Sequence, residues 1–505
     1  MRVAIRVDAS VEMGVGHVQR SVSLAQALRA RRAQISFVTR DLGFGSAAIM
    51  HEQGFEDVRV LPASENGSNR DGEPLTSCPS DIPHGDWARV DQRDDAAQTI
   101  AALAQEAPDW VVIDSYSFDA RWHETVRLGL GCRIAVIDDL ADRQLSPDLL
   151  IDHNLHEDHR MKYANVIDRE SRLLDGPRFG LLAPAYVTSP KYTYSPKVRS
   201  IGIFMGGGDA RNFSERMFDA VLASRFSGEI EIVLNSANSH LARLRERVEA
   251  RRGAFISTDL PDLAGFFARH DLQIGAGGGA TWERCCIGVP SVLVITADNQ
   301  NVVIPQIVAR DIAAAPDAPT VGAVARTVRR LIDNPARRRE LAENARATVD
   351  GFGAARVAVA MLAETLVVRP AVLADVQNLF DWRNAPDNRT MMTNADAMEY
   401  ADHCAWLDRV LADENRRLFV GEVGGEPVGS IRFDIVNGTA EVSLHLDPNF
   451  HGLGLGPKLL SAGEAASGAV SFIAKVLDKN RPSKLLFARS GYTRIGSENW
   501  RKDTV

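Results

Sequence analysis

Short apolar runs alternate with amphipathic stretches along the first 150 residues of the chain. Five runs have the length and the β-branched content of buried strands: residues 2–8, 35–39, 110–114, 133–138 and 149–152. Helical periodicity follows the first of them, where Val18, Val22, Ala25 and Leu28 fall on one face of a helix expected over 17–31. This alternation predicts a parallel sheet with helices on both faces.

The same alternation restarts after a proline-rich stretch, residues 184–197, which predicts an interdomain linker. Five more strands are expected, at residues 201–208, 230–235, 254–258, 272–279 and 291–296. A helical tail is expected over about 335–364. Two consecutive doubly wound halves predict a two-lobed α/β architecture that binds ligands at the C-terminal ends of its strands, in the crevice between the lobes.

The pattern changes to an antiparallel one from about residue 366. Residues 417–447 contain three strands, with turns at Gly424-Gly425 and Asn437-Gly438. We therefore expect three domains: an N-terminal Rossmann-like lobe (1–187), a nucleotide-binding lobe (198–364) and an α+β domain (366–505). Residues 62–95, rich in Ser, Asn, Asp, Gly and Pro, predict a long surface loop over the site, with disorder as the alternative.

Composition narrows the classes of function. The chain has 505 residues with a formal net charge of −8, which gives no global attraction for nucleic acid or for an anionic membrane. The N-terminus has no signal-peptide pattern, and no run of about 18 apolar residues predicts a membrane span. We expect a cytoplasmic enzyme. The five cysteines show no CxxC spacing, which argues against a zinc site, and Cys285 and Cys286 fit the core side of a helix.

The sequence GVGHVQR, residues 14–20, joins the first expected strand to the first helix. Gly14 and Gly16 allow a tight turn and a close approach of a ligand, and the helix N-terminus offers free N–H groups to an anion. His17 lies in the first helical turn, and an imidazole is suited to general-base catalysis at neutral pH. A capping or structural histidine is the alternative.

The second lobe contains two further glycine-rich turns. MGGGDARN (205–212) predicts a phosphate-binding turn in which Asp209 and Asn212 are helix caps or ligands. GAGGGATWERCCIGVP (275–290) leads into a helix that carries Glu283, whose carboxylate suits a ribose diol, although a solvated helix residue is the alternative. Asn299 and Gln300 follow the next strand, where amides can bind base or sugar oxygens.

Together with VIDSYSFD (112–119) and VIDDLADR (136–143), these motifs resemble the UDP-sugar hydrolases of the pseudaminic acid pathway over about residues 1–360. The resemblance implies a two-lobed GT-B fold. It also implies metal-free hydrolysis of UDP-2,4-diacetamido-2,4,6-trideoxy-β-L-altropyranose with inversion, and it makes His17 the general base. The positions expected to bind the UDP-sugar are Asp8, Gly14, Gly16, Asp114, Tyr116, Gly207, Gly208, Gly278, Gly279, Thr281, Glu283, Asn299 and Gln300.

The C-terminal third has its own glycine-rich turn, in VSLHLDPNFHGLGLGPKLL (442–460). Three glycines in five residues leave N–H groups free for a pyrophosphate at a helix N-terminus, with a purely structural turn as the alternative. With RNAPDNRTMM (383–392) and HCAWL (403–407), this region resembles the GNAT acetyltransferases that acetylate the 4-amino group of UDP-4-amino-4,6-dideoxy sugars. The positions expected to bind acetyl-CoA are Leu444, Leu446, Gly452, Gly454, Gly456 and Asn480.

Two positions depart from the GNAT pattern. His451 replaces the usual Arg or Gln at the start of the glycine turn, and Phe487 stands where many relatives have a tyrosine that protonates the leaving thiolate. Ser483 or water could take that role, and Tyr492 is expected in the core.

The two resemblances imply consecutive steps on one sugar nucleotide, N4-acetylation and then removal of UDP. The expected small-molecule partners are therefore a UDP-sugar and acetyl-CoA, the latter as co-substrate. A UDP-sugar glycosyltransferase fused to an acetyltransferase, and an inactive nucleotide-sugar-binding module, are the alternatives. A bacillosamine-type or legionaminic-type sugar is an alternative substrate. The sequence specifies no oligomeric state.

Overall fold

The computed structural model describes residues 1–10, 13–62, 81–167 and 169–503, and these form two compact units. One unit comprises Met1–Ala27 and Gln34–Val357; the other comprises Leu28–Ala33 and Ala358–Val505. Within the part of the chain so described, no helix has the length and apolar character needed to span a bilayer. The expected loop over 62–95 falls largely on residues outside the described ones; its end forms the short helix η2 (Gly85–Ala88) and the start of α3.

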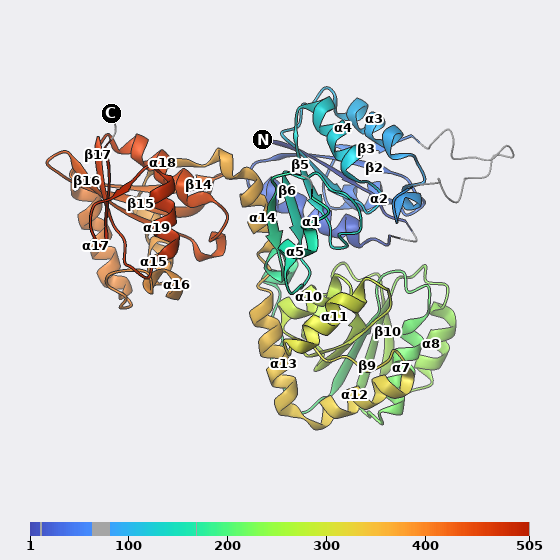
Figure 1. The fold of residues 1–505 in the computed structure, drawn as a ribbon. Coiled ribbons are helices and arrows are strands. Elements are labelled where there is room, and N and C mark those ends of the chain that lie inside the picture. Colours follow the sequence, from blue (N-terminus) through green and yellow to red (C-terminus); the bar gives the residue numbers. More distant parts are fainter. Residues whose placement is uncertain (11–12, 63–80, 168, 504–505) are drawn as a thin grey trace. The chain divides into compact units, whose positions relative to one another are not determined.

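The first lobe contains a seven-stranded, fully parallel sheet in the order β3-β2-β1-β4-β5-β6-β7 (Figure 1). Its strands are β1 (Arg2–Val7), β2 (Gln34–Arg40), β3 (Val58–Leu61), β4 (Trp110–Asp114), β5 (Arg133–Ile137), β6 (Leu149–Asp152) and β7 (Arg172–Asp175). Its helices are α1 (Gly16–Ala30), α2 (Ser46–Glu52), α3 (Gln92–Leu103), α4 (Ala120–Leu130), α5 (His159–Tyr163) and the single turn η3 (Pro177–Phe179). The short helix α6 (Ala185–Thr188) follows and packs on the second lobe. The five predicted strands are all present in this sheet.

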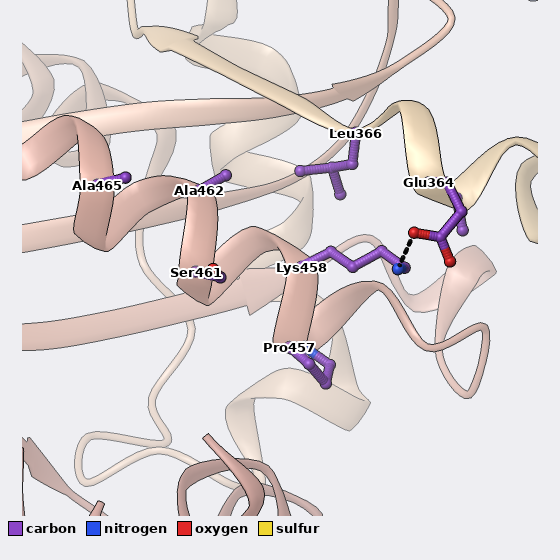
Figure 2. Close-up of a pocket in the computed structure, with 8 residues that line it drawn as sticks. Glu364, Leu366, Pro457, Lys458, Ser461, Ala462 and Ala465 are labelled. Atoms are coloured by element: carbon purple, nitrogen blue, oxygen red, sulfur yellow. Dashed lines mark hydrogen bonds and ion pairs between the residues drawn. The ribbon is translucent and has the colours of Figure 1, made fainter. Parts of the chain in front are cut away.

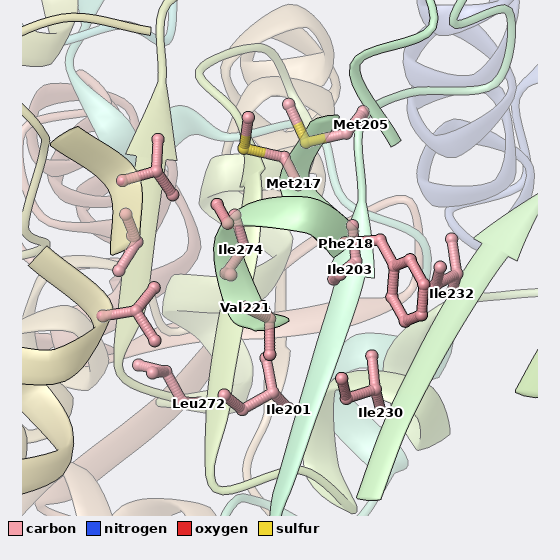
Figure 3. Packing of buried hydrophobic residues seen from close by; sticks show 14 of the residues in the cluster. Ile201, Ile203, Met205, Met217, Phe218, Val221, Ile230, Ile232, Leu272 and Ile274 are labelled. Atoms are coloured by element: carbon pink, nitrogen blue, oxygen red, sulfur yellow. The ribbon is translucent and has the colours of Figure 1, made fainter. Parts of the chain in front are cut away.

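The second lobe contains a five-stranded parallel sheet in the order β10-β9-β8-β11-β12. Its strands are β8 (Ser200–Phe204), β9 (Glu229–Leu234), β10 (Ala254–Thr258), β11 (Leu272–Ala276) and β12 (Ser291–Val294). The helices are α7 (Phe213–Ala223), α8 (Leu241–Glu249), α9 (Ala264–Ala268), α10 (Ala280–Ile287), α11 (Gln300–Ala309), α12 (Val321–Asp333), α13 (Pro335–Thr348) and α14 (Gly353–Leu362). Figure 3 shows Ile201, Ile203 and Ile274 from the sheet packing with Met217 and Phe218 from α7.

The proline-rich segment 184–197 is more than a connector. It contains α6, and Tyr186 and Tyr192 are buried in a core cluster with Trp282 and Cys285 of α10. The Tyr192 N–H donates to the carbonyl of Ile287 at 2.9 Å. The prediction of a linker was therefore wrong in this respect, because the segment also contains two tyrosines whose burial fixes it to the second lobe. Cys285 and Cys286 are buried helix residues, as predicted.

The second unit contains a mixed sheet in the order β13-β14-β15-β16-β17-β19-β18, in which only β16 and β17 pair in parallel. Its strands are β13 (Val367–Pro370), β14 (Arg416–Val423), β15 (Glu426–Val436), β16 (Thr439–Leu446), β17 (Ser471–Lys475), β18 (Thr493–Arg494) and β19 (Asn499–Asp503). Its helices are α15 (Val376–Asn384), α16 (Pro386–Arg389), α17 (Tyr400–Ala412), α18 (Leu455–Ser467) and α19 (Arg481–Arg489), with the short turns η4 (Ala363–Thr365), η5 (Leu373–Asp375) and η6 (Pro448–Phe450).

Both predicted hairpin turns are present in this sheet. Gly424 and Gly425 have φ of 62° and 88°, and Asn437 and Gly438 have φ of 50° and 79°. A two-residue turn with positive φ at both positions follows the twist of the flanking strands, and glycine or asparagine adopts it at least cost. The three strands expected in residues 417–447 are β14, β15 and β16.

Candidate functional site

The turn between β1 and α1 presents His17 at the carboxyl edge of the first sheet. Gly14 adopts the left-handed conformation, with φ of 71°, and its N–H donates to the carbonyl of Ser10 at 2.8 Å. Gly16 begins α1, so His17 lies in the first helical turn, where its side chain is largely buried. The predicted turn and the placement of this histidine are both seen in the structure.

The imidazole of His17 is held by a carboxylate from the neighbouring strand. Asp114 ends β4, directly beside Val7 of β1, and its Oδ1 lies 2.5 Å from Nδ1 of His17. Nη2 of Arg20, which can only donate, also lies 3.1 Å from this Nδ1, but the carboxylate contact is the shorter one. Because a carboxylate only accepts hydrogen bonds, we assign the proton to Nδ1. The lone pair of Nε2 is then free, and no described residue forms a hydrogen bond with it, so Nε2 can accept a proton from water.

Arg20, one turn further along α1, completes this arrangement. Its Nε and Nη2 donate to the two oxygens of Asp114 at 2.6 and 2.5 Å. Burial works to raise the pKa of Asp114, but Arg20 and His17 outweigh it and hold that pKa well below the usual range. Asp114 therefore orients His17, and its expected contact with the substrate stays a prediction.

A chain of hydrogen bonds runs from this site to the second lobe. The ring of Tyr116 packs edge-on to His17, with centroids 4.9 Å apart, and its hydroxyl donates to Asp139. Asn154 donates to the other oxygen of Asp139 at 2.5 Å and accepts from Nε1 of Trp282, on α10, at 2.9 Å. The side chain of Tyr116 therefore links the site to helix α10 and is only slightly exposed.

Sequence reasoning missed His153, which directly follows β6. Its side chain is 6% exposed, and Nδ1 is buried without a hydrogen-bond partner among the described residues. Burial and the nearby Arg20 lower the pKa of His153 to about 4, which keeps the ring neutral. A signal was available, because His153 ends a strand at the same carboxyl edge as Asp114.

Asp8 lies beneath the site. It accepts from Arg6 at 2.5 Å and from the backbone N–H of Arg40 at 2.7 Å, and it is 1% exposed. Arg6 also pairs with the buried Asp95. Asp8 therefore fixes the end of β1 to β2 through Oδ1, whereas Oδ2 is buried without a hydrogen-bond partner among the described residues, and binding of the UDP-sugar by Asp8 stays a prediction.

The glycine turns of the second lobe are open at the carboxyl edge of its sheet. Gly208, Gly278 and Gly279 have no atom within 4 Å of the position that a Cβ would take, and all three are exposed. A Cβ on Gly207 would lie 3.6 Å from the side chain of Val15, in the loop that carries His17. The second lobe therefore brings one of its glycine turns to the histidine-bearing loop of the first.

Asp209 caps the helix after the first of these turns. Its two carboxylate oxygens accept from the backbone N–H groups of Phe213 and Ser214, both at 2.8 Å. Asn212 donates to Glu215 instead. Of the two predicted roles, the structure favours the cap for Asp209.

The polar positions around α10 and α11 divide into buried and exposed groups. Thr281 is buried and accepts from Arg284, and Gln300 accepts from the N–H of Thr296 at 2.8 Å. Asn299 is exposed at the start of α11. The first two stabilise the turns, whereas Asn299 is available to a ligand.

Glu283 has a tyrosine for a neighbour. It accepts a hydrogen bond from the hydroxyl of Tyr186 on α6, and burial raises its pKa. Burial and the carboxylate of Glu283 also raise the pKa of Tyr186. Glu283 is only partly exposed, so the alternative of a fully solvated helix residue is wrong, and a ribose diol would share the carboxylate with Tyr186.

A second candidate site lies in the other unit, where two parallel strands separate. β16 and β17 pair from Thr439↔Ser471 to Val442↔Ala474 and no further. Residues 443–446 of β16 therefore have no partner strand on that side within the described part of the chain, and Leu444 and Leu446 are partly buried. Unpaired backbone groups at such an opening can bind an extended chain with amide groups.

The glycine turn continues from the end of this strand. Gly452 and Gly454 have φ of 78° and 72° and are exposed, with no atom near their Cβ positions, and Gly454 is the residue before α18. Gly456 is buried within α18 and contacts Leu486 of α19. The first two glycines open the turn towards an anion, and the third allows the close approach of two helices.

Asn480 and two aromatic residues define the start and the core of α19. Asn480 caps the helix by accepting from the N–H of Ser483 at 3.0 Å. Phe487 is buried against Tyr492, with ring centroids 4.9 Å apart, and the hydroxyl of Tyr492 donates to Glu464 at 2.7 Å. Tyr492 is a core residue, as predicted.

A shallow hollow of about 420 Å³ lies between α18 and the segment that precedes β13 (Figure 2). Lys458 and Glu364 form an ion pair of 2.7 Å across it, and Leu366, Ser461 and Ala462 also line it. None of the residues expected to bind acetyl-CoA lines this hollow, so it is separate from the glycine turn.

Comparisons with known proteins match the two units of the chain separately. Residues 376–492 match the Acetyltransferase (GNAT) family. The spore coat polysaccharide biosynthesis protein SpsG of Bacillus subtilis (strain 168) is 23% identical over 307 residues, which cover 60% of this chain and 79% of that protein.

Two solved structures share the fold of the first unit. A putative UDP-N-acetylglucosamine 2-epimerase from Listeria monocytogenes covers 72% of this chain and 96% of its own, with a TM-score of 0.51 and 14% identity. MnaA of S. aureus, in its co-structure with UDP, covers 70% of this chain and 94% of its own, with a TM-score of 0.51 and 12% identity. The chain therefore joins an SpsG-like, two-lobed GT-B fold to a C-terminal GNAT acetyltransferase domain.

Proposed function

We propose that the chain is a bifunctional enzyme of pseudaminic acid biosynthesis. The two-lobed region hydrolyses UDP-2,4-diacetamido-2,4,6-trideoxy-β-L-altropyranose to UDP and the free sugar, with inversion. The GNAT domain transfers an acetyl group from acetyl-CoA to the 4-amino group of the precursor UDP-sugar. The motif resemblance over residues 1–360 and the similarity to a spore coat polysaccharide biosynthesis protein support a sugar nucleotide as the substrate of the first region.

One observation carries the hydrolase assignment: Asp114 and Arg20 hold His17 in the tautomer that leaves Nε2 free. A base so oriented can take a proton from water while the oxygen attacks the anomeric carbon from the face opposite the diphosphate, which gives inversion. In this mechanism the N–H groups of the open turns at Gly207, Gly208, Gly278 and Gly279 stabilise the charge that develops on the leaving UDP. No step calls for a metal ion.

The acetyltransferase assignment rests on the family match together with the opening between β16 and β17. We assign residues 443–446 to the pantetheine arm of acetyl-CoA and the exposed turn at Gly452 and Gly454 to its pyrophosphate. Phe487 cannot protonate the leaving thiolate, so we assign that proton to water or to Ser483, at the start of α19.

The two reactions are consecutive on one sugar nucleotide. Covalent linkage raises the concentration of the acetylated intermediate near the second site, provided that the domains allow transfer. We also propose that the three domains span residues 1–187, 198–364 and 366–505. We place the enzyme in the cytoplasm, where UDP-sugars and acetyl-CoA are both available.

The test follows the two products separately. Wild-type protein is incubated with acetyl-CoA and UDP-4-amino sugars, and free thiol and UDP are measured over time, without any sugar or lipid acceptor. We expect thiol release first, then UDP release from the acetylated product, and UDP free of ¹⁸O when the reaction runs in H₂¹⁸O, because water attacks carbon and not phosphorus. UDP release only after an acceptor is added would favour the alternative, a GT-B glycosyltransferase.

A further inference from the structure

A cluster of positive charge lies on one face of the acetyltransferase sheet. Along β16, Leu444 and Leu446 belong to the core beneath α18, so the intervening His445 faces the other side. On that side Ser430 pairs with His445 and Arg432 pairs with Ser443, while Leu418 and Val420 of β14 pack on α15 and α17. His445 therefore lies on the face covered by α15 and α17, just beyond the last pair between β16 and β17.

Two arginines of the segment that contains α15 and α16 form no ion pair with a carboxylate in the part of the chain that the structure describes. Arg383, in the last turn of α15, donates to the carbonyls of Asn394 and Asp396, and no ion pair to it is found among the described residues. Arg389, at the end of α16, has a buried Nε without any hydrogen-bond partner in that part of the chain. Arg432 is different, because it pairs with Asp434 at 2.8 Å and lies over the ring of Trp406.

The electrostatic effects agree with this proximity. Burial and the charge of Arg389 lower the pKa of Arg383 although the carboxylate of Asp396 acts to raise it. Burial together with Arg383 and Arg432 lowers the pKa of His445 to about 4. The carboxylates of β15 and β16 are Asp434, paired with Arg432, Glu426, paired with Arg31, and the exposed Glu441. Positive charge that is compensated only in part, in a partly buried place, favours the binding of an anion.

We propose, on the basis of the function given above, that Arg383, Arg389 and His445 form the acceptor subsite of the acetyltransferase: the two guanidinium groups bind the diphosphate of a nucleotide-linked amino sugar, and the neutral imidazole accepts the proton that its amine loses. The amine nitrogen attacks the thioester carbonyl, the C–N bond forms and the C–S bond breaks. CoA leaves as the thiolate, and the proton of the nitrogen passes to His445.

The subsite couples binding of the acceptor to the strength of the base. Without an anion, the arginine charges keep the imidazole a weak base. A bound diphosphate compensates these charges, so the proton affinity of His445 rises only when the acceptor is in place. Asn388, between the two arginines in sequence, donates to the carbonyl of Leu446 at 2.9 Å and so fixes this segment to the end of β16.

The test compares two acceptors that carry the same amine, the UDP-4-amino sugar and its uncharged methyl glycoside, in the full-length chain. Arg389→Gln should raise KM for the nucleotide sugar by about 10- to 100-fold, the range of a lost charge-assisted pair, without changing KM for acetyl-CoA or for the glycoside. Arg409→Gln, which changes an exposed arginine of α17, is the matched control and should have no effect. His445→Gln should lower kcat by about 100-fold or more for the nucleotide sugar. It should lower kcat by less for the glycoside, which has no diphosphate to raise the proton affinity of the imidazole.

The outcomes separate this subsite from the proposed function. If the wild-type protein transfers acetyl groups, an Arg389→Gln variant that keeps the wild-type preference for the nucleotide sugar would overturn the subsite alone. A His445→Gln variant with the wild-type kcat would do the same. Absence of thiol release with every amine, from protein that binds acetyl-CoA, would overturn the acetyltransferase function itself. Circular dichroism and acetyl-CoA binding establish that each variant is folded.

Discussion

Replacing Asp114 by Asn tests how the first site holds its histidine. The carboxylate of Asp114 is fully buried and accepts from His17, from two nitrogens of Arg20 and, at 3.2 Å, from the hydroxyl of Ser21. An amide carries no charge, and its NH2 group replaces Oδ2, the oxygen that accepts from Nε of Arg20 and from Ser21, so a donor then faces a donor. The buried guanidinium of Arg20 then loses its partner.

The contacts of Asp114 predict how far Asp114→Asn should lower the stability of the first unit and the rate of UDP release. Removal of one partner from a buried ion pair costs about 3–5 kcal/mol of stability, so the melting temperature of the first unit should fall. We propose Asp114 as a positioning residue that acts through His17. Loss of the oriented tautomer should then lower kcat for UDP release by about 100-fold, or roughly 2.7 kcal/mol, with little change in KM.

The assay measures UDP release and acetyl transfer by the same preparation of Asp114→Asn. Acetyl transfer at the wild-type rate shows that the protein is intact, and a thermal scan gives the change in stability. Ser21→Ala is the matched control, because it removes one weak hydrogen bond and leaves the charge, so we expect a loss of less than about threefold. A folded Asp114→Asn protein that releases UDP at the wild-type rate would refute the reasoning.

Two further predictions concern the other site and the effect of pH. Gly454→Asp places a Cβ at a positive φ and a negative charge at the start of α18, so KM for acetyl-CoA should rise by at least about tenfold. The control Gly438→Asp, in an equally open hairpin turn, should leave this KM unchanged. Equal KM values in the two variants would argue against the pyrophosphate turn. Burial lowers the pKa of His153 to about 4 and that of His123 to about 3, so between pH 7 and 4.5 the unfolded chain gains protons that the folded chain does not. The free energy of unfolding should therefore fall by about 2 kcal/mol for each ring as the pH falls through this range. Denaturant titrations of His153→Gln should show a weaker dependence of this free energy on pH, and an unchanged dependence would contradict the role of His153.

The parts of the fold that depend on local sequence were predictable. Glycine pairs with positive φ specify hairpins, and apolar runs with glycine-rich ends specify strands that lead into helices. The inner five strands of the first sheet, the five of the second, β14 to β16 and the turns at His17 and Gly454 were therefore predictable, whereas the edge strands β3 and β7 were not predicted. The segment 184–197 was misjudged because its prolines outweigh two aromatic residues, whose burial depends on the surface of α10.

Roles that depend on long-range pairing were not predictable in the same way. Asp114 lies 97 positions from His17, and only the pairing of β1 with β4 makes it the partner of the imidazole. Glu283 was expected to bind a diol, but its contact with Tyr186 depends on where α6 packs. Sequence motifs thus located the carboxyl edges of the sheets, and the distribution of hydrogen bonds there required the structure.

The central claim is that the imidazole of His17 delivers water to the sugar nucleotide. The most direct measurement is the single-turnover rate of UDP release by His17→Ala, with acetyl transfer by the same protein as the internal standard. We predict a loss of UDP release of about 10²- to 10⁴-fold, with acetyl transfer unchanged. UDP release at the wild-type rate, from protein that still transfers acetyl groups, would contradict the account.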